Sequence, residues 1–278
     1  MKIQDRLRAP KGVVRVGDFD AAGTPGFKGD KSDAKTDQAE LAGDLAELQE
    51  KLHAHGTTDG ANQSLLLVLQ GMDTSGKGGV IKHVIGQVDP QGVRITSFKK
   101  PTAEERAHDF LWRIERAVPS NGQIGIFDRS QYEDVLIQRV ESMANPEEIE
   151  RRYGAINEFE HNLAESGVRI VKCFLNVSRE KQAERLLERL EDPHKHWKYN
   201  PGDVDARQKW DAYMEAYGIA LTRCNEDSAP WYVIPSDTKW YRNWAITALL
   251  TEIMAEMDLG WPVADFDVEV EKKRVLAS

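Results

Sequence analysis

A glycine-rich segment carries the clearest chemical signal in this chain of 278 residues. Residues 71–79 read Gly-Met-Asp-Thr-Ser-Gly-Lys-Gly-Gly, follow an apolar run at 65–69 and precede a helical pattern. This order of strand, loop and helix is that of a phosphate-binding P-loop. Backbone N–H groups and the positive end of a helix converge on one point there, and Lys77 adds a full positive charge. The candidate phosphate-binding residues are Gly71, Thr74, Ser75, Gly76, Lys77, Gly78 and Gly79.

The loop departs from the common motif at its metal ligand. A hydroxyl residue usually follows the lysine and binds Mg²⁺, but here Gly78 follows it and an acidic residue, Asp73, stands inside the loop. We interpret Asp73 as a metal ligand that replaces the missing hydroxyl. Two alternatives remain at this point: Asp73 only caps the turn, since Asp is common in turns, or the whole loop is a structural turn.

A second acidic position follows another apolar run. The run at 124–127 ends in Asp128, which is the position of a Walker B carboxylate that holds Mg²⁺ directly or through water. The next residue, Arg129, could neutralise charge on a phosphoryl group during transfer, or it could form a salt bridge to a nearby acid. Glu133 could join the metal site, orient Arg129, or occupy the first turn of a helix. The catalytic candidates are therefore Asp73, Lys77, Asp128 and Arg129.

A basic segment with broken helices lies at about 185–209. It includes the cations Arg189, Lys195 and Lys198, and Pro193 and Pro201 interrupt its helical pattern. A mobile basic hairpin of this kind suits a lid over a polyanionic phosphate. Acidic residues in the same segment offset much of the positive charge, so a solvated surface is the alternative.

The elements that must position these residues alternate along the chain. Apolar runs predict five strands at 65–70, 93–98, 124–127, 168–175 and 231–234, with helical patterns between them, one of them around 103–117. Strands separated by helices pair in parallel through right-handed crossovers, and ligands then bind at the carboxyl ends of the strands. The sequence thus predicts an α/β fold with a doubly wound, parallel, five-stranded sheet, and both acidic motifs lie at such strand ends.

The remaining parts of the chain fit around this sheet. Residues 1–35 predict an irregular N-terminal arm that drapes over the body or over a neighbouring subunit. Leucines at 41, 45, 48 and 52 predict a helix with one apolar stripe, which ends at residues 56–60. We expect a single domain at 36–260 that includes the lid, and a C-terminal tail at 261–278.

Composition limits the classes of partner. The formal net charge is −9 and the pI is about 5.4, which argues against a surface built for nucleic acid or anionic lipid. The two cysteines, Cys173 and Cys224, predict buried thiols rather than a disulfide framework. With no apolar leader at the N-terminus and no run of membrane-spanning length, we expect a cytoplasmic protein without membrane or nucleic-acid partners.

Taken together, these segments resemble the polyphosphate kinase 2 family, whose members move phosphoryl groups between inorganic polyphosphate and nucleotides. The resemblance rests on residues 71–79, on 127–136 (Phe-Asp-Arg-Ser-Gln-Tyr-Glu-Asp-Val-Leu), and on 189–200 (Arg-Leu-Glu-Asp-Pro-His-Lys-His-Trp-Lys-Tyr-Asn). Shorter matches occur from about residue 15 to 260, so the combination is far more specific than any one motif. The segments Tyr-Glu-Asp-Val-Leu and Phe-Lys-Lys-Pro-Thr look most like the subgroup that phosphorylates both nucleoside mono- and diphosphates.

The resemblance implies a P-loop kinase fold related to thymidylate kinase with a helical lid. It implies Mg²⁺, with Mn²⁺ as the alternative metal, held by Asp73 and Asp128 with Glu133 as a further candidate. It also implies polyphosphate and AMP, ADP or ATP as substrates, and a homo-oligomer, either a dimer or a tetramer. By resemblance, Lys77 binds phosphate, Arg129 is the Walker B arginine, and the lid cations Arg189, Lys195 and Lys198 bind polyphosphate.

Two other functions compete with this interpretation. An ATP-dependent nucleoside monophosphate kinase would share the P-loop and the lid and would differ in its phosphoryl donor. A non-catalytic polyphosphate- or nucleotide-binding regulator would be favoured if a carboxylate or arginine of the site were missing, but each is present in the sequence.

Overall fold

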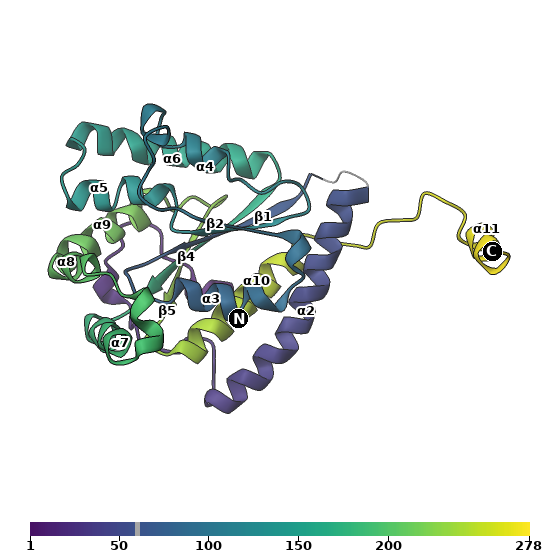
Figure 1. Ribbon diagram of the computed structural model, residues 1–278, viewed down its shortest axis with the longest axis horizontal. Coiled ribbons are helices and arrows are strands. Elements are labelled where there is room, and N and C mark those ends of the chain that lie inside the picture. The colour runs from purple at the N-terminus through teal and green to yellow at the C-terminus, as the bar shows by residue number, and fades with distance from the viewer. Residues whose placement is uncertain (59–61) are drawn as a thin grey trace.

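The computed structural model describes residues 1–58 and 62–278, and its centre is one parallel sheet (Figure 1). The strand order is β2-β3-β1-β4-β5, and every neighbouring pair is parallel, which confirms the predicted sheet. After β1, the chain adds β2 and β3 on one side of this strand and then β4 and β5 on its other side. The strand order therefore switches beside β1, and a crevice opens at the carboxyl end of β1. The strands are β1 (Ser64–Gln70), β2 (Val93–Ser97), β3 (Ile124–Asp128), β4 (Val168–Asn176) and β5 (Trp231–Pro235).

Helices cover both faces of the sheet (Figure 1). One face carries α1 (Ile3–Leu7), α2 (Lys31–Thr58), α3 (Lys77–His83) and α10 (Lys239–Ala255). The opposite face carries α4 (Trp112–Glu115), α5 (Ile137–Val140), α6 (Pro146–Glu165) and α9 (Trp210–Arg223). The central strands are therefore buried on both faces, as their unbroken apolar sequences predict.

Three further helices lie outside these two layers. At one end of the sheet are α7 (Arg179–Glu191), a 3₁₀ segment (Pro193–Lys198) and α8 (Gly202–Gln208). These three elements span the residues predicted as a lid, 185–209, and Pro193 and Pro201 lie where the helices are interrupted. The last helix, α11 (Val268–Leu276), lies away from the body at the end of an extended segment (Figure 1).

The N-terminal residues are more ordered than the predicted arm. Residues 3–7 form α1, and α2 starts at Lys31, before the predicted boundary at residue 36. The backbone N–H of Ala9 donates to Trp231 O at 2.8 Å, and Arg8 forms an antiparallel bridge with Tyr232. This segment therefore lies on the body of its own chain, where it forms one isolated antiparallel bridge beside the edge strand β5.

The leucine-rich helix begins before the leucine pattern, at Lys31, and its last described residue, Thr58, lies within the predicted end at 56–60. It packs along α10 through its apolar stripe and continues through Gly56 to Thr58. A Cβ at Gly56 would lie 2.5 Å from the Cα of Gly122, so this glycine permits a close contact with a neighbouring turn and does not end the helix. The rest of the predicted end, residues 59 and 60, lies outside the described residues.

The helix predicted around 103–117 is shorter than expected. Only the 3₁₀ turn Glu105–Ala107 and the single turn of α4 form there. Arg113 donates to Lys99 O at 2.8 Å and lies 3.5 Å from Asp134, so long-range contacts fix this segment as a loop. Helical propensity is a weak preference that such contacts override.

A buried ion pair lies beneath β4. Lys172 has no exposed surface, and its Nζ lies 2.5 Å from Glu160 Oε2. Tyr132 Oη donates to Glu160 Oε1 and accepts from Lys172 Nζ, both at 2.8 Å, and Lys172 also donates to Cys224 O. Each charge therefore depends on the other, because neither has access to water.

We expect Glu160→Gln to lower the free energy of unfolding by about 3–5 kcal/mol, because it leaves the ammonium of Lys172 buried without a counter-charge. Urea unfolding of the full chain, followed by circular dichroism, measures this difference. Glu158→Gln is the matched control, since Glu158 lies on the same helix but is exposed. Equal urea midpoints for the two variants would show that the buried pair does not matter for stability.

Both cysteines are free and buried, as predicted. Burial raises the pKa of Cys224 to about 12 and moves that of Cys173 upward as well, so both thiols stay protonated and unreactive. Across residues 1–58 and 62–278, no helix combines the length and the apolar character needed to cross a membrane.

Candidate active site

The glycine-rich loop turns sharply between β1 and α3. Gly71 has φ +151° and Gly76, the N-cap of α3, has φ +114°. Thr74, which is not a glycine, adopts φ +64°. Such backbone angles cost energy for most residues, so the loop keeps a shape that its neighbours must hold in place.

Polar groups within the loop point to a ligand. Lys77 Nζ donates to Gly71 O at 2.7 Å and to Met72 O at 3.4 Å. Burial lowers the pKa of Lys77, and Asp73 acts in the opposite direction by favouring the charged form. The hydroxyls of Thr74 and Ser75 are buried and have no hydrogen-bond partner among the described residues. Buried hydroxyls of this kind are ready to donate to an anion such as phosphate.

Two arginines from distant elements hold the loop. Arg185 of α7 donates to Thr74 O at 2.9 Å, and through its other nitrogen to Ser236 O at 2.6 Å and Asp237 O at 2.9 Å. Arg242 of α10 donates to Ser75 O at 3.3 Å. Burial and the nearby Arg185 lower the pKa of Arg242 to about 10.

Arg242 also explains why glycine is needed at position 76. A Cβ on Gly76 would lie 1.8 Å from Nη1 of Arg242, and the positive φ would add strain. Sequence reasoning missed Arg242, since α10 follows the loop by some 160 residues and carries no motif. Arg185 is the first residue of the predicted basic segment, but no motif in the sequence relates it to the loop.

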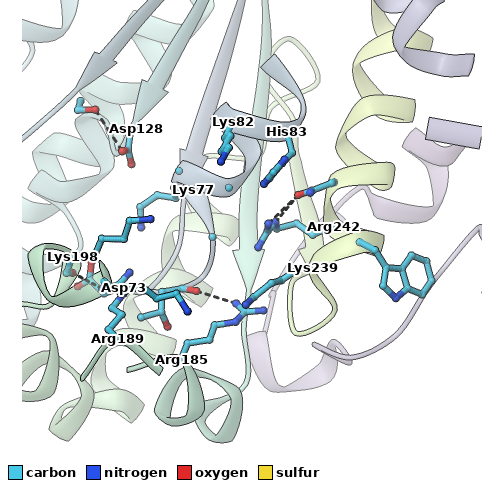
Figure 2. Close-up of a pocket in the computed structure, with 18 of the residues that line it drawn as sticks. Asp73, Lys77, Lys82, His83, Asp128, Arg185, Arg189, Lys198, Lys239 and Arg242 are labelled. Atoms are coloured by element: carbon cyan, nitrogen blue, oxygen red, sulfur yellow. Dashed lines mark hydrogen bonds between the residues drawn. The ribbon is translucent and has the colours of Figure 1, made fainter. Parts of the chain in front are cut away.

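Asp128 lies at the carboxyl end of β3, as predicted. It pairs in register with Leu69 of β1 and Ser97 of β2, so it lies beside the start of the loop. Ser97 Oγ lies at the hydrogen-bond limit of 3.5 Å from Asp128 Oδ2. The carboxylate thus stays available to the cavity, and Figure 2 shows it across Lys77 from Asp73.

Arg129 joins the two acidic motifs. Its Nη2 donates to Asp73 Oδ1 at 2.8 Å, so the salt bridge considered for Arg129 is present and its acid is Asp73. Burial opposes ionisation of Asp73, but Lys77 and Arg129 outweigh it and hold the pKa of Asp73 below its usual value. Arg129 itself has φ +65°, and its backbone N–H donates to Leu69 O at 3.1 Å. This strained position directs the guanidinium toward the loop.

Glu133 lies near Arg129 but does not line the cavity. It accepts from Gln70 Nε2 at 3.1 Å and lies in the 3₁₀ segment Gln131–Asp134, which Ser130 caps. Burial lowers the pKa of Arg129, but Glu133 first and then Asp73 outweigh this and raise it. The position of Glu133 therefore favours two of its three predicted roles, to orient Arg129 and to occupy the first turn of a helix, over direct metal binding.

The basic segment closes one side of the site. Arg189 donates to Lys198 O at 2.8 Å and to Asp203 Oδ2 at 3.1 Å, which ties α7 to α8. Burial and then repulsion by Asp73 raise the pKa of Asp203 to about 6. Residues of the segment therefore meet residues of the loop, and the segment is not simply a solvated surface.

These groups share one cavity of about 1630 Å³, which Figure 2 shows in close-up. It brings together most of the predicted site residues: Asp73, Thr74, Gly76, Lys77, Gly78, Gly79, Asp128, Arg129, Arg189, Lys195 and Lys198. Gly71, Ser75 and Glu133 lie outside its lining. Other cations that the sequence did not single out also line it, namely Lys31, Lys35, Lys82, Lys239 and Arg242.

The donor set suits a hard cation that phosphate helps to bind. In the described part of the chain, no group of three or more His, Cys, Asp or Glu side chains forms a ready metal site. Asp73 and Asp128 line the same cavity, together with Glu188 and Asp203, and Asp73 has a lowered pKa. Mg²⁺ commonly uses one or two carboxylates and takes its other ligands from water and substrate phosphates.

Comparison with known proteins identifies relatives along most of the chain. A family model described as polyphosphate kinase 2 matches residues 28–260. An AMP/ADP-polyphosphate phosphotransferase of Meiothermus ruber is 42% identical over 253 residues, which cover 91% of this chain and 93% of that protein. An ADP-polyphosphate phosphotransferase of Rhodopseudomonas palustris is 39% identical over 230 residues, which cover 78% of each.

Solved structures show the same similarity. The crystal structure of polyphosphate kinase 2 from Arthrobacter aurescens TC1 superposes with a TM-score of 0.97 and 50% identity. The superposition covers 100% of this chain and 98% of that one. The expected P-loop kinase architecture thus agrees with an experimentally determined structure.

Proposed function

Because the chain belongs to the polyphosphate kinase 2 family, we propose that it transfers a phosphoryl group from inorganic polyphosphate to a nucleotide, AMP to ADP or ADP to ATP. The observation that carries this proposal is the single cavity, in which the P-loop and two carboxylates meet a row of cations. A polyanion and a nucleotide both need such positive charge along their length.

The use of both acceptors rests on similarity. The Meiothermus ruber relative is named for AMP and ADP, and it is similar along nearly the whole chain. We propose the same pair of acceptors here, with a cytoplasmic location and assembly into a homo-oligomer.

The residues of the site have different roles in an in-line phosphoryl transfer that forms no covalent enzyme intermediate. Lys77, the loop N–H groups and the free hydroxyl of Thr74 bind phosphate oxygens. Arg129, oriented by Asp73 and Glu133, lies where it can neutralise charge on the group in transfer. The lid cations Arg189, Lys195 and Lys198 hold the polyphosphate chain and exclude water.

Asp73 and Asp128 would hold Mg²⁺, or Mn²⁺ in its place. The metal, when bound, would neutralise phosphate charge and fix the geometry of the transfer. The protein's own contribution is then mainly positioning and electrostatic stabilisation, as in other phosphoryl transfers.

A donor assay tests this function against an ATP-dependent nucleoside monophosphate kinase. Purified protein is incubated with Mg²⁺ and AMP, with either polyphosphate or ATP as the only donor, and nucleotides are separated by chromatography. We expect ADP to form with polyphosphate and not with ATP, and a second reaction with ADP and polyphosphate to give ATP. ADP formation from AMP and ATP alone would favour the rival kinase, and no transfer from either donor would favour a binding protein.

A further inference from the structure

The guanidinium of Arg129 has little support from its own side-chain contacts. The Arg129 side chain is 40% exposed, and among the described residues its hydrogen-bond partner is Asp73. A long side chain loses rotamer freedom when it is ordered, and one partly exposed salt bridge offsets little of that loss. The direction of Arg129 must therefore come largely from its backbone.

That backbone lies in a strained turn. Arg129 has φ +65°, in the left-handed region that is unfavourable for residues other than glycine. Such a conformation persists only where the surrounding structure holds it in place. On the N-terminal side, the N–H of Arg129 donates to Leu69 O at 3.1 Å, and Asp128 pairs within the sheet. The C-terminal side of the turn needs a second anchor.

One buried carboxylate supplies this anchor. Glu160 Oε1 accepts from Gln131 Nε2 at 2.9 Å and from Tyr132 Oη at 2.8 Å. These two residues follow Arg129 by two and three positions, and neither has any exposed surface. Burial raises the pKa of Tyr132 and Glu160 acts in the same direction, so the phenol stays protonated and donates. Glu160 therefore holds both residues on the C-terminal side of the turn.

Glu160 is itself fixed by the body of the protein. Lys172 of β4 donates to Glu160 Oε2 at 2.5 Å. Glu160 is 3% exposed and lies outside the lining of the catalytic cavity. The same helix, α6, also carries Arg152, which donates to Asp134 O at 2.9 Å. Since α6 packs on one face of the sheet (Figure 1), the turn is held by a rigid element behind the site.

The buried ion pair adds direction more than stability. Removal of one partner alone is costly, but replacement of a whole buried pair by packed apolar residues is often neutral or stabilising. Burial of this region therefore does not require charges. Hydrogen bonds restrict distance and angle, which apolar contacts do not. Two such bonds on neighbouring residues limit how the turn before them can move.

We propose that Glu160 is a positioning residue for phosphoryl transfer: through Gln131 and Tyr132 it holds the turn that directs Arg129 into the cavity. Because Glu160 lies outside the cavity lining, it acts on the reaction only through Arg129. The inference rests on the proposed function, in which Arg129 neutralises charge on the group in transfer. A misplacement of about 1 Å in a group that acts on the reacting atoms can cost about 10²-fold in rate.

Tyr132→Phe tests this role, because it removes one bond to Glu160 and keeps the packed ring. We expect kcat to fall by about 10- to 10²-fold, while KM for ADP and for polyphosphate stays the same. Tyr153→Phe is the matched control: Tyr153 lies on α6 and is 1% exposed, but its Oη has no hydrogen-bond partner among the described residues. Luminescent detection of ATP formed from ADP and polyphosphate gives both constants, and circular dichroism gives the folded fraction.

A double-mutant cycle separates positioning from a purely structural role. In an Arg129→Ala background, Tyr132→Phe should change kcat by less than about twofold, because the residue that it positions is gone. An equal loss in both backgrounds would overturn the proposal, and so would a Tyr132→Phe protein with the turnover of Tyr153→Phe. If Tyr132→Phe does not fold, Gln131→Met removes the other bond to Glu160, and the same cycle and the same criteria apply to it.

The unaltered chain separates this inference from the proposed function. Transfer from polyphosphate by the unaltered chain, with equal losses in the two backgrounds of the cycle, would overturn only the positioning role of Glu160. No transfer from either donor would overturn the proposed function and the positioning role with it.

Discussion

Lys77→Ala is expected to lower kcat/KM for phosphoryl transfer by about 10²–10³-fold, comparable to the loss of one preorganised donor at a site of developing charge. The ammonium of Lys77 is held inside the loop by Gly71 O and Met72 O, at the point where α3 begins. No other lysine belongs to the P-loop itself, so alanine removes a positive charge that its neighbours cannot replace. Coupled measurement of nucleotide formation over a range of polyphosphate concentrations gives kcat and KM separately.

The matched control for this lysine is Lys11→Ala. Lys11 is exposed, pairs with Asp227 at 3.0 Å and does not line the catalytic cavity. Its loss should change stability by less than about 1 kcal/mol and leave transfer unchanged. If Lys77→Ala kept the turnover of the control, Lys77 would have no part in catalysis. A circular dichroism spectrum equal to that of the unaltered chain shows that the fold is intact.

Asp128→Asn is expected to abolish most transfer, by about 10³-fold or more, and to raise the Mg²⁺ concentration that gives half of the remaining activity. The substitution keeps the shape of the side chain and its place beside Ser97, but it removes the negative charge at the end of β3. Because neutral amides bind Mg²⁺ less strongly than carboxylates, the metal dependence should change together with kcat. Activity titrated with Mg²⁺ measures both quantities.

Asp109→Asn serves as the control for Asp128. Asp109 is exposed, pairs with Arg151 at 3.1 Å and accepts from the backbone N–H of Leu111, a bond that an amide oxygen can also accept, so its substitution tests the loss of one carboxylate charge away from the cavity. We expect its activity and Mg²⁺ dependence to equal those of the unaltered chain. An Asp128→Asn protein with an unchanged Mg²⁺ titration would remove Asp128 from the metal site.

The pattern of residues along the chain was sufficient to predict the parallel sheet and the local motifs. Four of the five strands are short apolar runs, and an apolar run that lies between helices has few other ways to be buried. The fifth, β2, is a partly exposed edge strand with a mixed sequence, Val-Arg-Ile-Thr-Ser. The loop at 71–79 and the acid at the end of β3 are local too, because each depends on residues next to it in the chain. Their predicted position at one edge of the sheet then follows from parallel pairing alone.

Contacts between distant residues could not be predicted in this way. Arg242 reaches the loop from α10, and Gln182 donates to Asp73 O at 3.2 Å from α7. No spacing in the sequence relates these residues to the loop. The same reason explains the close contact of Gly56 with Gly122, which the sequence did not predict.

The anchoring of α7 decides how the cavity can open. Arg185 is bonded to the loop and to the residues that follow β5, so the first half of α7 forms one rigid block with the sheet edge. A hinge for substrate entry must therefore lie after Arg185, and the moving part runs from near Arg189 to before Arg207, because Arg207 of α8 donates to Arg179 O and Gln182 Oε1 in the first half of α7. Opening then carries away the cations that hold the polyphosphate chain and leaves the loop in its folded shape. The protein can release one substrate without having to rebuild its phosphate cradle before the next turnover.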